Sequence, residues 1–132
     1  MDVRTFLKEH TLIFDGAMGS YLMTEYHRQA DGCETTNLEA PEQVKAVHQA
    51  YLASGCNAIK TNTFGANRLT MGEETCRKVI EAGWNIAKEA AGDAFVFADL
   101  GPVPMTDAKR ALEEYRFSVD IFLELGAKNF LF

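Results

Sequence analysis

Short apolar runs alternate along the chain with longer segments in which apolar residues recur every three or four positions. The short runs lie at residues 11–14, 58–61, 95–98 and 129–132. Runs of this length, bounded by polar and glycine residues, predict buried strands. The longer segments, at residues 20–29, 41–54, 73–91 and from Thr106 or Asp107 to 125, predict amphipathic helices. The order βα-βα-βα-β predicts an α/β protein with a parallel sheet covered by helices.

Residues with known positional preferences mark several helix ends. Pro41 suits the first position of a helix, and Gly55 and Gly126 suit the position just after one. Residues 30–40 are polar and lack a helical period, which predicts a long irregular loop.

Three of the predicted strands end in an acidic or polar cluster that includes glycine. These clusters are Asp15-Gly16, Thr61-Asn62-Thr63-Phe64-Gly65 and Asp99-Leu100-Gly101. Right-handed crossovers place the carboxyl ends of parallel strands at one edge of the sheet, where α/β proteins bind small molecules. We therefore predict that the three clusters face one shared ligand site.

Each candidate side chain has a functional and a structural interpretation. Asp15 either holds an ammonium or another polar group of a ligand, or it caps the next helix. Thr61 and Thr63 either hydrogen-bond a ligand or satisfy loop amides, while Phe64 either forms an apolar wall or packs in the core. Asp99 has the same ambiguity, and capping is its simpler role. The glycine spacing in the first cluster lacks the pattern of a phosphate-binding loop.

The histidines and cysteines have no metal-binding spacing, since neither CxxC nor HExxH occurs. His48 lies within an amphipathic segment and is expected at the surface or at a helix edge. Cys33 lies in the polar loop and could be reactive, although no neighbouring base supports a nucleophile. Cys56 and Cys76 are expected to be buried as small apolar residues. No residue is therefore predicted to be a catalytic group.

Composition and charge exclude several classes of protein. The chain has 132 residues, enough for one domain or part of one, and 47% are hydrophobic. The net charge of −6 is spread along the chain, which argues against nucleic acids and anionic membranes as partners. No apolar run reaches the roughly 18 residues of a membrane span, and the N-terminus has no signal-peptide pattern. Three widely spaced cysteines favour a reducing, cytoplasmic location.

Several motifs occur together, in order, over nearly the whole chain. They are Asp15-Gly16-Ala17-Met18-Gly19-Ser20, Asn37-Leu38 with Pro41-Glu42, Ala50-Tyr51-Leu52-Ala53-Ser54-Gly55, Thr61-Asn62-Thr63-Phe64 and Gly101-Pro102. In this combination they resemble the homocysteine S-methyltransferase domain. That family includes the N-terminal module of cobalamin-dependent methionine synthase and betaine–homocysteine methyltransferase.

The resemblance implies a (β/α)8 TIM barrel, and such a barrel needs about 250 residues. The chain would supply strands one to three with their helices and the start of strand four, so residues 1–132 would be the truncated N-terminal part of the domain. The family binds homocysteine and a zinc ion held by three cysteine thiolates from the second half of the barrel. None of the cysteines here matches those positions. We therefore expect this segment alone to be inactive.

The resemblance also assigns the substrate-binding residues and the chemistry. Asp15 and Gly16 match residues near homocysteine on the first strand, and Thr61, Thr63 and Phe64 match residues that line the same pocket. In the family, zinc activates the homocysteine thiolate for methylation to methionine. The methyl donor stays open among methylcobalamin, methyltetrahydrofolate, betaine and S-methylmethionine, because donor specificity is set outside this segment. Cobalamin or methyltetrahydrofolate would act through other modules.

One position departs from the family pattern, where Asp99 stands in place of the serine expected before the Gly-Pro turn. The contact made there is therefore open.

Two further expectations concern partners and alternatives. A half barrel leaves sheet edges and one apolar face uncovered, which favours self-association or pairing with the missing half of the barrel. The alternative to a methyltransferase domain is a small flavodoxin-like βα module with a binding or assembly role. That alternative would have an acidic pair after the first strand and a lysine at a late strand end, and neither is evident.

Overall fold

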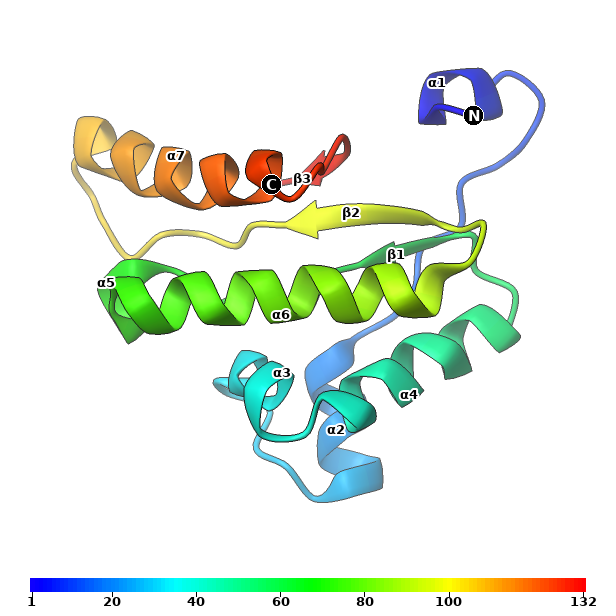
Figure 1. Cartoon of the computed structure of the whole chain (residues 1–132), viewed down its shortest axis with the longest axis horizontal. Helices are drawn as coiled ribbons and strands as arrows, with labels where there is room; N and C mark the ends of the chain where they lie inside the picture. Colours follow the sequence, from blue (N-terminus) through cyan, green and yellow to red (C-terminus); the bar gives the residue numbers. More distant parts are fainter.

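The computed structural model describes all residues from Met1 to Phe132 and contains a parallel sheet with helical crossovers (Figure 1). The strands are β1 (Ala58–Lys60), β2 (Phe95–Asp99) and β3 (Phe130–Leu131). The helices are α1 (Val3–Phe6), α2 (Met18–Tyr26), α3 (Thr36–Glu39), α4 (Pro41–Ala53), α5 (Arg68–Met71), α6 (Glu73–Ala91) and α7 (Ala108–Glu124), with a 3-10 turn η1 (Cys33–Thr35). The predicted α/β class is confirmed.

The strands lie side by side in chain order, β1-β2-β3, and all pairs are parallel. Ile59 is in register with Val96, and Ala98 with Phe130. Phe14 forms a parallel bridge to Ala58, so the segment before it extends the same order. This sequential order differs from the 2-1-3-4-5 order of flavodoxin-like sheets.

The prediction of a strand at residues 11–14 was wrong, because this segment forms only an isolated bridge, from Phe14 to Ala58. The side chain of Asn57 explains the difference. Its Oδ1 accepts from the Ile13 amide at 2.7 Å, and its Nδ2 donates to the Thr11 carbonyl at 2.9 Å. These backbone groups bond to a side chain and not to a neighbouring strand, so no ladder extends along them.

The predicted loop at residues 30–40 was also wrong in part, because η1 and α3 lie within it. Asn37 anchors this segment, since its Nδ2 donates to the Asn62 carbonyl at 2.8 Å and to the Val79 carbonyl at 3.1 Å. These partners are 25 and 42 residues away, so no local pattern reveals them. Tertiary hydrogen bonds therefore order a segment that is polar in composition.

The helix ends show which local signals decided them. Pro41 is the first residue of α4, and Gly55, with φ of 107°, follows its end. The carboxylate of Asp107 accepts from the Arg110 amide at 2.9 Å, so Asp107 and not Thr106 caps α7.

One face of the sheet packs on α6 and α7. Ile59, Val96 and Ala98 share a core with the buried residues of these helices. Phe122 of α7 packs edge-to-face on Trp84 of α6, with ring centroids 6.2 Å apart. Burial of aromatic side chains of this size contributes strongly to the free energy of folding.

The other face of the sheet carries the alternate residues. Phe14 and Phe97 pack edge-to-face with centroids 4.8 Å apart. At the amino end of β2, Phe6 of α1 packs on Phe95 at 5.1 Å, and Figure 1 shows α1 beside that end. Asp99 follows the same alternation and lies at the carboxyl end of this face.

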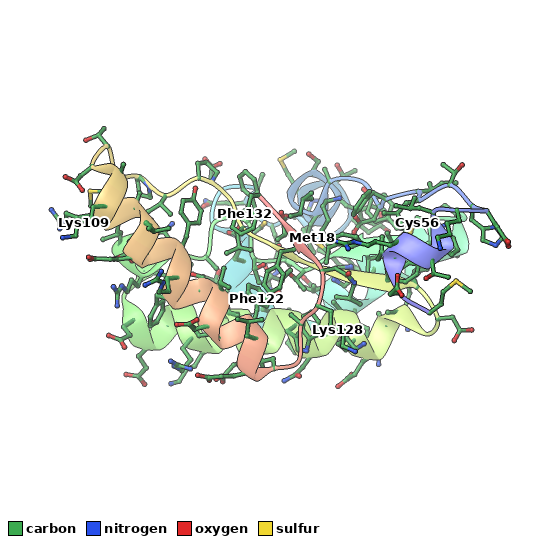
Figure 2. All side chains as sticks on the ribbon, turned by 90° about the horizontal axis from the view of Figure 1, so that it is seen from above. Met18, Cys56, Lys109, Phe122, Lys128 and Phe132 are labelled. Carbon is green, nitrogen blue, oxygen red and sulfur yellow. The ribbon has the colours of Figure 1, made fainter.

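The two ends of the sheet lie far apart. Figure 2 shows Cys56, just before β1, and Lys109, at the start of α7, at opposite ends of the molecule.

None of the helices has the length and apolar character needed to cross a membrane.

Candidate functional site

A cavity of about 270 Å³ lies at the carboxyl ends of β1, β2 and the Phe14 segment. Its wall includes four of the predicted site residues, Asp15, Gly16, Thr61 and Phe64. The remaining lining residues are Ala17, Met18, Gly19, Ala30, Cys33, Glu34, Lys60, Asn62 and Asp99. Thr63, the fifth predicted residue, is buried behind this wall. The three strand-end clusters thus meet at one place.

Asp15 lines the cavity and is paired with Lys60. Its carboxylate accepts from the Lys60 amide at 3.2 Å and from the Lys60 ammonium at 2.5 Å. The ammonium also donates to the Asp15 carbonyl at 2.9 Å. Burial raises the pKa of Asp15, and the Lys60 bonds act in the opposite direction. Asp15 does not cap α2, whose N-cap residue is Ala17.

His48 of α4 lies next to Asp15, and the expectation that it is at the surface or at a helix edge was wrong. Its side chain is fully buried, with Nδ1 3.9 Å from an Asp15 carboxylate oxygen. Neither ring nitrogen has a hydrogen-bond partner. Burial, with a smaller contribution from Lys60, lowers the pKa of His48 to about 4. His48 is therefore neutral at neutral pH, and a helical period alone did not show that it faces inward.

The hydroxyl groups of Thr61 and Thr63 tie the ends of β1 and β2 together. The two oxygens lie 2.7 Å apart, the Thr63 hydroxyl donates to the Asp99 carbonyl at 2.7 Å, and the Asp99 amide donates to the Thr61 hydroxyl at 3.1 Å. These bonds form a closed chain of donors and acceptors. Both threonines therefore fix the backbone of Asp99, as in the structural interpretation of the sequence, and a contact of either hydroxyl with a ligand stays a prediction.

Phe64 stands at the rim of the cavity and does not pack in the core, since 58% of it is exposed. The backbone beneath its ring is held by Gly101, whose amide donates to the Phe64 carbonyl at 3.0 Å. A Cβ on Gly101 would overlap that carbonyl. The Gly-Pro turn after β2 thus needs glycine because two backbones approach closely.

Asn62 and Cys33 form the inner side wall. The side-chain Nδ2 of Asn62 donates to the Cys33 carbonyl at 3.1 Å and to Asn37 Oδ1 at 3.0 Å. Burial raises the pKa of the Cys33 thiol to about 11, so the thiol is protonated and a poor nucleophile. Cys33 is thus buried, not accessible as its place in a polar segment suggested.

The other two cysteines differ from each other. Cys76 is buried as predicted, whereas Cys56 is only partly buried. All three cysteines are free thiols. No group of three histidine, cysteine, aspartate or glutamate side chains comes together in a way that could hold a metal ion.

The cavity is rich in carboxylates. Glu34 is 7% exposed, and its Oε1 accepts from the Gly65 amide at 2.8 Å. The carboxylate of Asp99 has no hydrogen bond and no ion pair, and burial raises its pKa to about 6. With Asp15 and Lys60 this gives three acids and one base on the wall. The cavity therefore favours a ligand that carries a cationic group.

The sequence did not predict the parts played by Lys60 and Glu34. Lys60 is the last residue of β1 and directly precedes Thr61, so its place at a strand end was the one available signal. Glu34 lies in the segment predicted as a loop, and nothing local linked it to Gly65.

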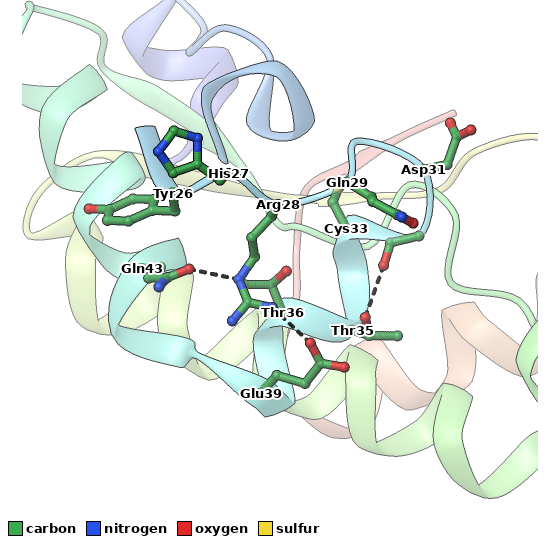
Figure 3. A pocket seen from close by; sticks show the side chains of 11 residues that line it. Tyr26, His27, Arg28, Gln29, Asp31, Cys33, Thr35, Thr36, Glu39 and Gln43 are labelled. Carbon is green, nitrogen blue, oxygen red and sulfur yellow. Dashed lines mark hydrogen bonds and ion pairs between the residues drawn. The ribbon is translucent and has the colours of Figure 1, made fainter. Parts of the chain in front are cut away.

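A second, larger cavity of about 450 Å³ lies on the outside of the fold, between the end of α2 and the start of α4 (Figure 3). Its one arginine, Arg28, donates to Gln43 Oε1 at 2.7 Å and to Glu39 Oε2 at 2.8 Å. Figure 3 shows the guanidinium held between these two side chains. None of the predicted site residues lies there, and its cation is already paired within the protein.

Comparisons with known proteins identify the family of the chain. The chain is 28% identical over 118 residues to methionine synthase of Mycobacterium tuberculosis (strain ATCC 25618 / H37Rv), and this covers 76% of the chain and 10% of that relative. Methionine synthase of Mycobacterium leprae is 27% identical over the same length. The chain thus spans about a tenth of the length of these relatives.

Solved structures of the homocysteine methyltransferase MmuM from Escherichia coli have the same fold. The metallated form superimposes with a TM-score of 0.82 at 21% identity, over 97% of this chain and 55% of that one. The apo form gives a TM-score of 0.73 at 24% identity. The model of the family described as homocysteine S-methyltransferase matches residues 12–131. The chain therefore belongs to the homocysteine S-methyltransferase family.

Proposed function

We propose that residues 1–132 form the N-terminal part of a homocysteine-binding TIM barrel, in a protein that methylates homocysteine to methionine. The observation that carries the proposal is the cavity at the strand ends, where the motifs shared with the family meet. A cavity of about 270 Å³ suits a ligand the size of an amino acid.

The cavity offers complementary groups for both ends of an amino acid. Its three carboxylates outnumber the single lysine, so this wall is acidic and would receive the ammonium group. The first residues of α2, Met18 and Gly19, line the same cavity, and no side chain caps this helix. Free amides at a helix N-terminus bind carboxylates. Phe64 covers the ligand from the rim. Gly16 allows the Tyr51 ring to pack against the backbone of this wall, since a Cβ there would lie 2.7 Å from the Tyr51 hydroxyl.

The part that this chain plays is to bind and orient the substrate. Orientation of a reacting group lowers the entropic part of an activation barrier. The resemblance implies zinc activation of the homocysteine thiolate, but no group of residues in this chain fits a zinc site. The zinc ligands would lie in the rest of the barrel, and this segment alone would be inactive. Cobalamin or methyltetrahydrofolate would act through other modules.

The uncovered surface supports pairing with the other half of the barrel or self-association. Ile13, Phe14 and Phe132 are 51%, 37% and 77% exposed, and Phe132 directly follows the edge strand β3. Exposed apolar side chains beside an unpaired strand favour association with another sheet. Three free thiols suit the proposed cytoplasmic location.

The proposal is tested by homocysteine binding to a complete domain that contains this chain. Asp15→Ala removes one member of the Asp15–Lys60 pair, and we expect it to weaken binding by about 1–3 kcal/mol. The matched control is Asp93→Ala, an exposed aspartate before the opposite end of β2. Isothermal titration calorimetry gives the affinities, and thermal unfolding checks the fold. Equal affinities for wild type and Asp15→Ala would remove Asp15 from the site.

A further inference from the structure

The side chain of Glu34 bonds to the peptide group that joins Phe64, at the rim of the cavity, to Gly65. We propose that Glu34 is a positioning residue, which together with Gly101 clamps this peptide group and so fixes the direction in which the Phe64 ring faces the cavity at the strand ends. This assignment rests on the proposed function and gives the segment at residues 30–40 a part in substrate binding.

The clamp holds one peptide group at both of its ends. The Gly101 amide donates to the Phe64 carbonyl at 3.0 Å, and the Gly65 amide donates to Glu34 Oε1 at 2.8 Å. The Phe64 carbonyl and the Gly65 amide belong to the same planar peptide group. A rotation of that plane breaks both bonds at once, so the two bonds together fix its orientation.

Two glycines make this close approach possible. A Cβ on Gly65 would lie 2.8 Å from Glu34 Oε1. A Cβ on Gly101 would overlap the Phe64 carbonyl and lie 3.0 Å from the Phe64 ring. The carboxylate on one side and the Gly101 backbone on the other therefore leave the peptide group little room to move.

Glu34 can hold this peptide group because its own backbone is anchored to the same strand end. The carbonyl of the preceding residue, Cys33, accepts from Asn62 Nδ2 at 3.1 Å, and Asn37 Nδ2 donates to the Asn62 carbonyl at 2.8 Å. The Glu34 residue is only 7% exposed, so its side chain has little freedom to turn away. The turn that carries Glu34 therefore cannot follow a shorter side chain towards Gly65.

The Phe64 ring is part of a wall between two cavities. Ala30, Glu34 and Phe64 line both the cavity at the strand ends and a neighbouring cavity of about 430 Å³. The backbone decides which directions the ring can take, since side-chain rotamers depend on backbone dihedrals. If the peptide group turned freely, only a fraction of the molecules would present the ring to the substrate, and the apparent Kd would rise as that fraction fell. Every residue of the clamp belongs to this chain, so the rest of the barrel is not needed to form it.

Two substitutions separate the reach of the Glu34 side chain from its charge. Glu34→Asp keeps the carboxylate but is one CH2 group shorter, whereas Glu34→Gln keeps an acceptor oxygen at the same reach without the charge. In a complete domain that contains this chain, we expect Glu34→Asp to weaken L-homocysteine binding by roughly 5- to 30-fold and Glu34→Gln by less than about threefold. The matched control is Glu39→Asp, in the same segment but paired with Arg28 at the outer cavity, and it should change the affinity by less than about twofold.

A second measurement asks whether Glu34 acts through Phe64. Phe64→Ala should itself weaken binding of L-homocysteine, and in that background Glu34→Asp should cause no further loss, because the ring that Glu34 positions is gone. Hydrogen exchange of the Gly65 amide should be faster in Glu34→Asp than in wild type or in Glu34→Gln, and this readout needs no ligand.

The results separate this assignment from the proposed function. If wild type binds L-homocysteine and both Glu34 variants lose affinity equally, the charge and not the clamp matters, so the assignment is wrong and the proposed function stands. Unchanged affinity in Glu34→Asp or in Phe64→Ala, or an equal effect of Glu34→Asp with and without the Phe64 ring, would overturn the assignment in the same way. If wild type binds no L-homocysteine at millimolar concentration, the proposed function and the assignment both fail.

Discussion

Asn37 connects the segment at residues 30–40 to both the cavity wall and the core helix, so its removal tests the account of the fold. Its side chain is 2% exposed. Nδ2 donates to the Asn62 carbonyl at 2.8 Å and to the Val79 carbonyl at 3.1 Å, while Oδ1 accepts from the Asn62 amide at 3.0 Å. Asn37→Ala removes all three bonds at once.

The magnitude follows from what each partner loses. The buried backbone carbonyl of Asn62 would lose the hydrogen bond that Asn37 donates to it, which costs about 1–3 kcal/mol. The Val79 carbonyl lies inside α6 and can keep its helical bond, so its loss is smaller. The Asn62 amide still donates to the Cys33 carbonyl. With the space left by the side chain, we expect a total loss of about 2–4 kcal/mol in the free energy of unfolding.

The assay is urea unfolding followed by far-UV circular dichroism. The control is Asn85→Ala, an exposed asparagine of α6, which should change the free energy of unfolding by less than about 0.5 kcal/mol. A loss for Asn37→Ala no larger than that of Asn85→Ala would refute the reasoning, because the buried bonds would then contribute nothing to stability.

Two further changes test the packing and the electrostatics of the same region. Gly83→Ala should destabilise the fold by about 1–3 kcal/mol in urea unfolding, although alanine favours helices, because its Cβ would lie 2.8 Å from Asn37 Nδ2 and from Thr63 Cγ2; a gain in stability would contradict this packing. The pKa of His48 is about 4 in the folded protein and 6.5 in the unfolded chain. On acidification the His48 imidazole of the unfolded chain therefore takes up a proton before that of the folded protein. Its contribution to stability should fall by up to about 3 kcal/mol as pH drops from 6.5 to 4. Asp99 acts in the opposite direction across this window, so the measurement is the difference between wild type and His48→Leu at each pH, and a difference that does not change with pH would refute it.

The elements with strong local signals were predicted well. Residues 73–91 form α6 as predicted, and the strands at 58–61 and 95–98 are within one residue of β1 and β2. Helical periodicity, Pro41 and the glycines after helices were enough for these. The misplaced parts, at residues 11–14 and 30–40, depend on the side chains of Asn57 and Asn37. Such long-range bonds leave no period in the sequence.

The candidate site shows the same division. Parallel topology alone predicted that Asp15, Thr61 and Asp99 would meet at one edge of the sheet, since strand ends share an edge. The partner of each side chain did not follow from topology. That Lys60 occupies Asp15 while Asp99 stays free is decided by side-chain packing. Position in the fold was therefore predictable, and the division of roles among the carboxylates was not.

The central claim is that homocysteine binds at the strand ends, and backbone NMR of a complete domain containing this chain tests it most directly. Titration with L-homocysteine should shift the amide signals of Gly16, Gly19, Asn62 and Gly65, which line or adjoin the cavity. The signals of Arg28 and Gly32 at the outer cavity should not move. Shifts confined to the outer cavity, or none at saturating ligand, would contradict the account.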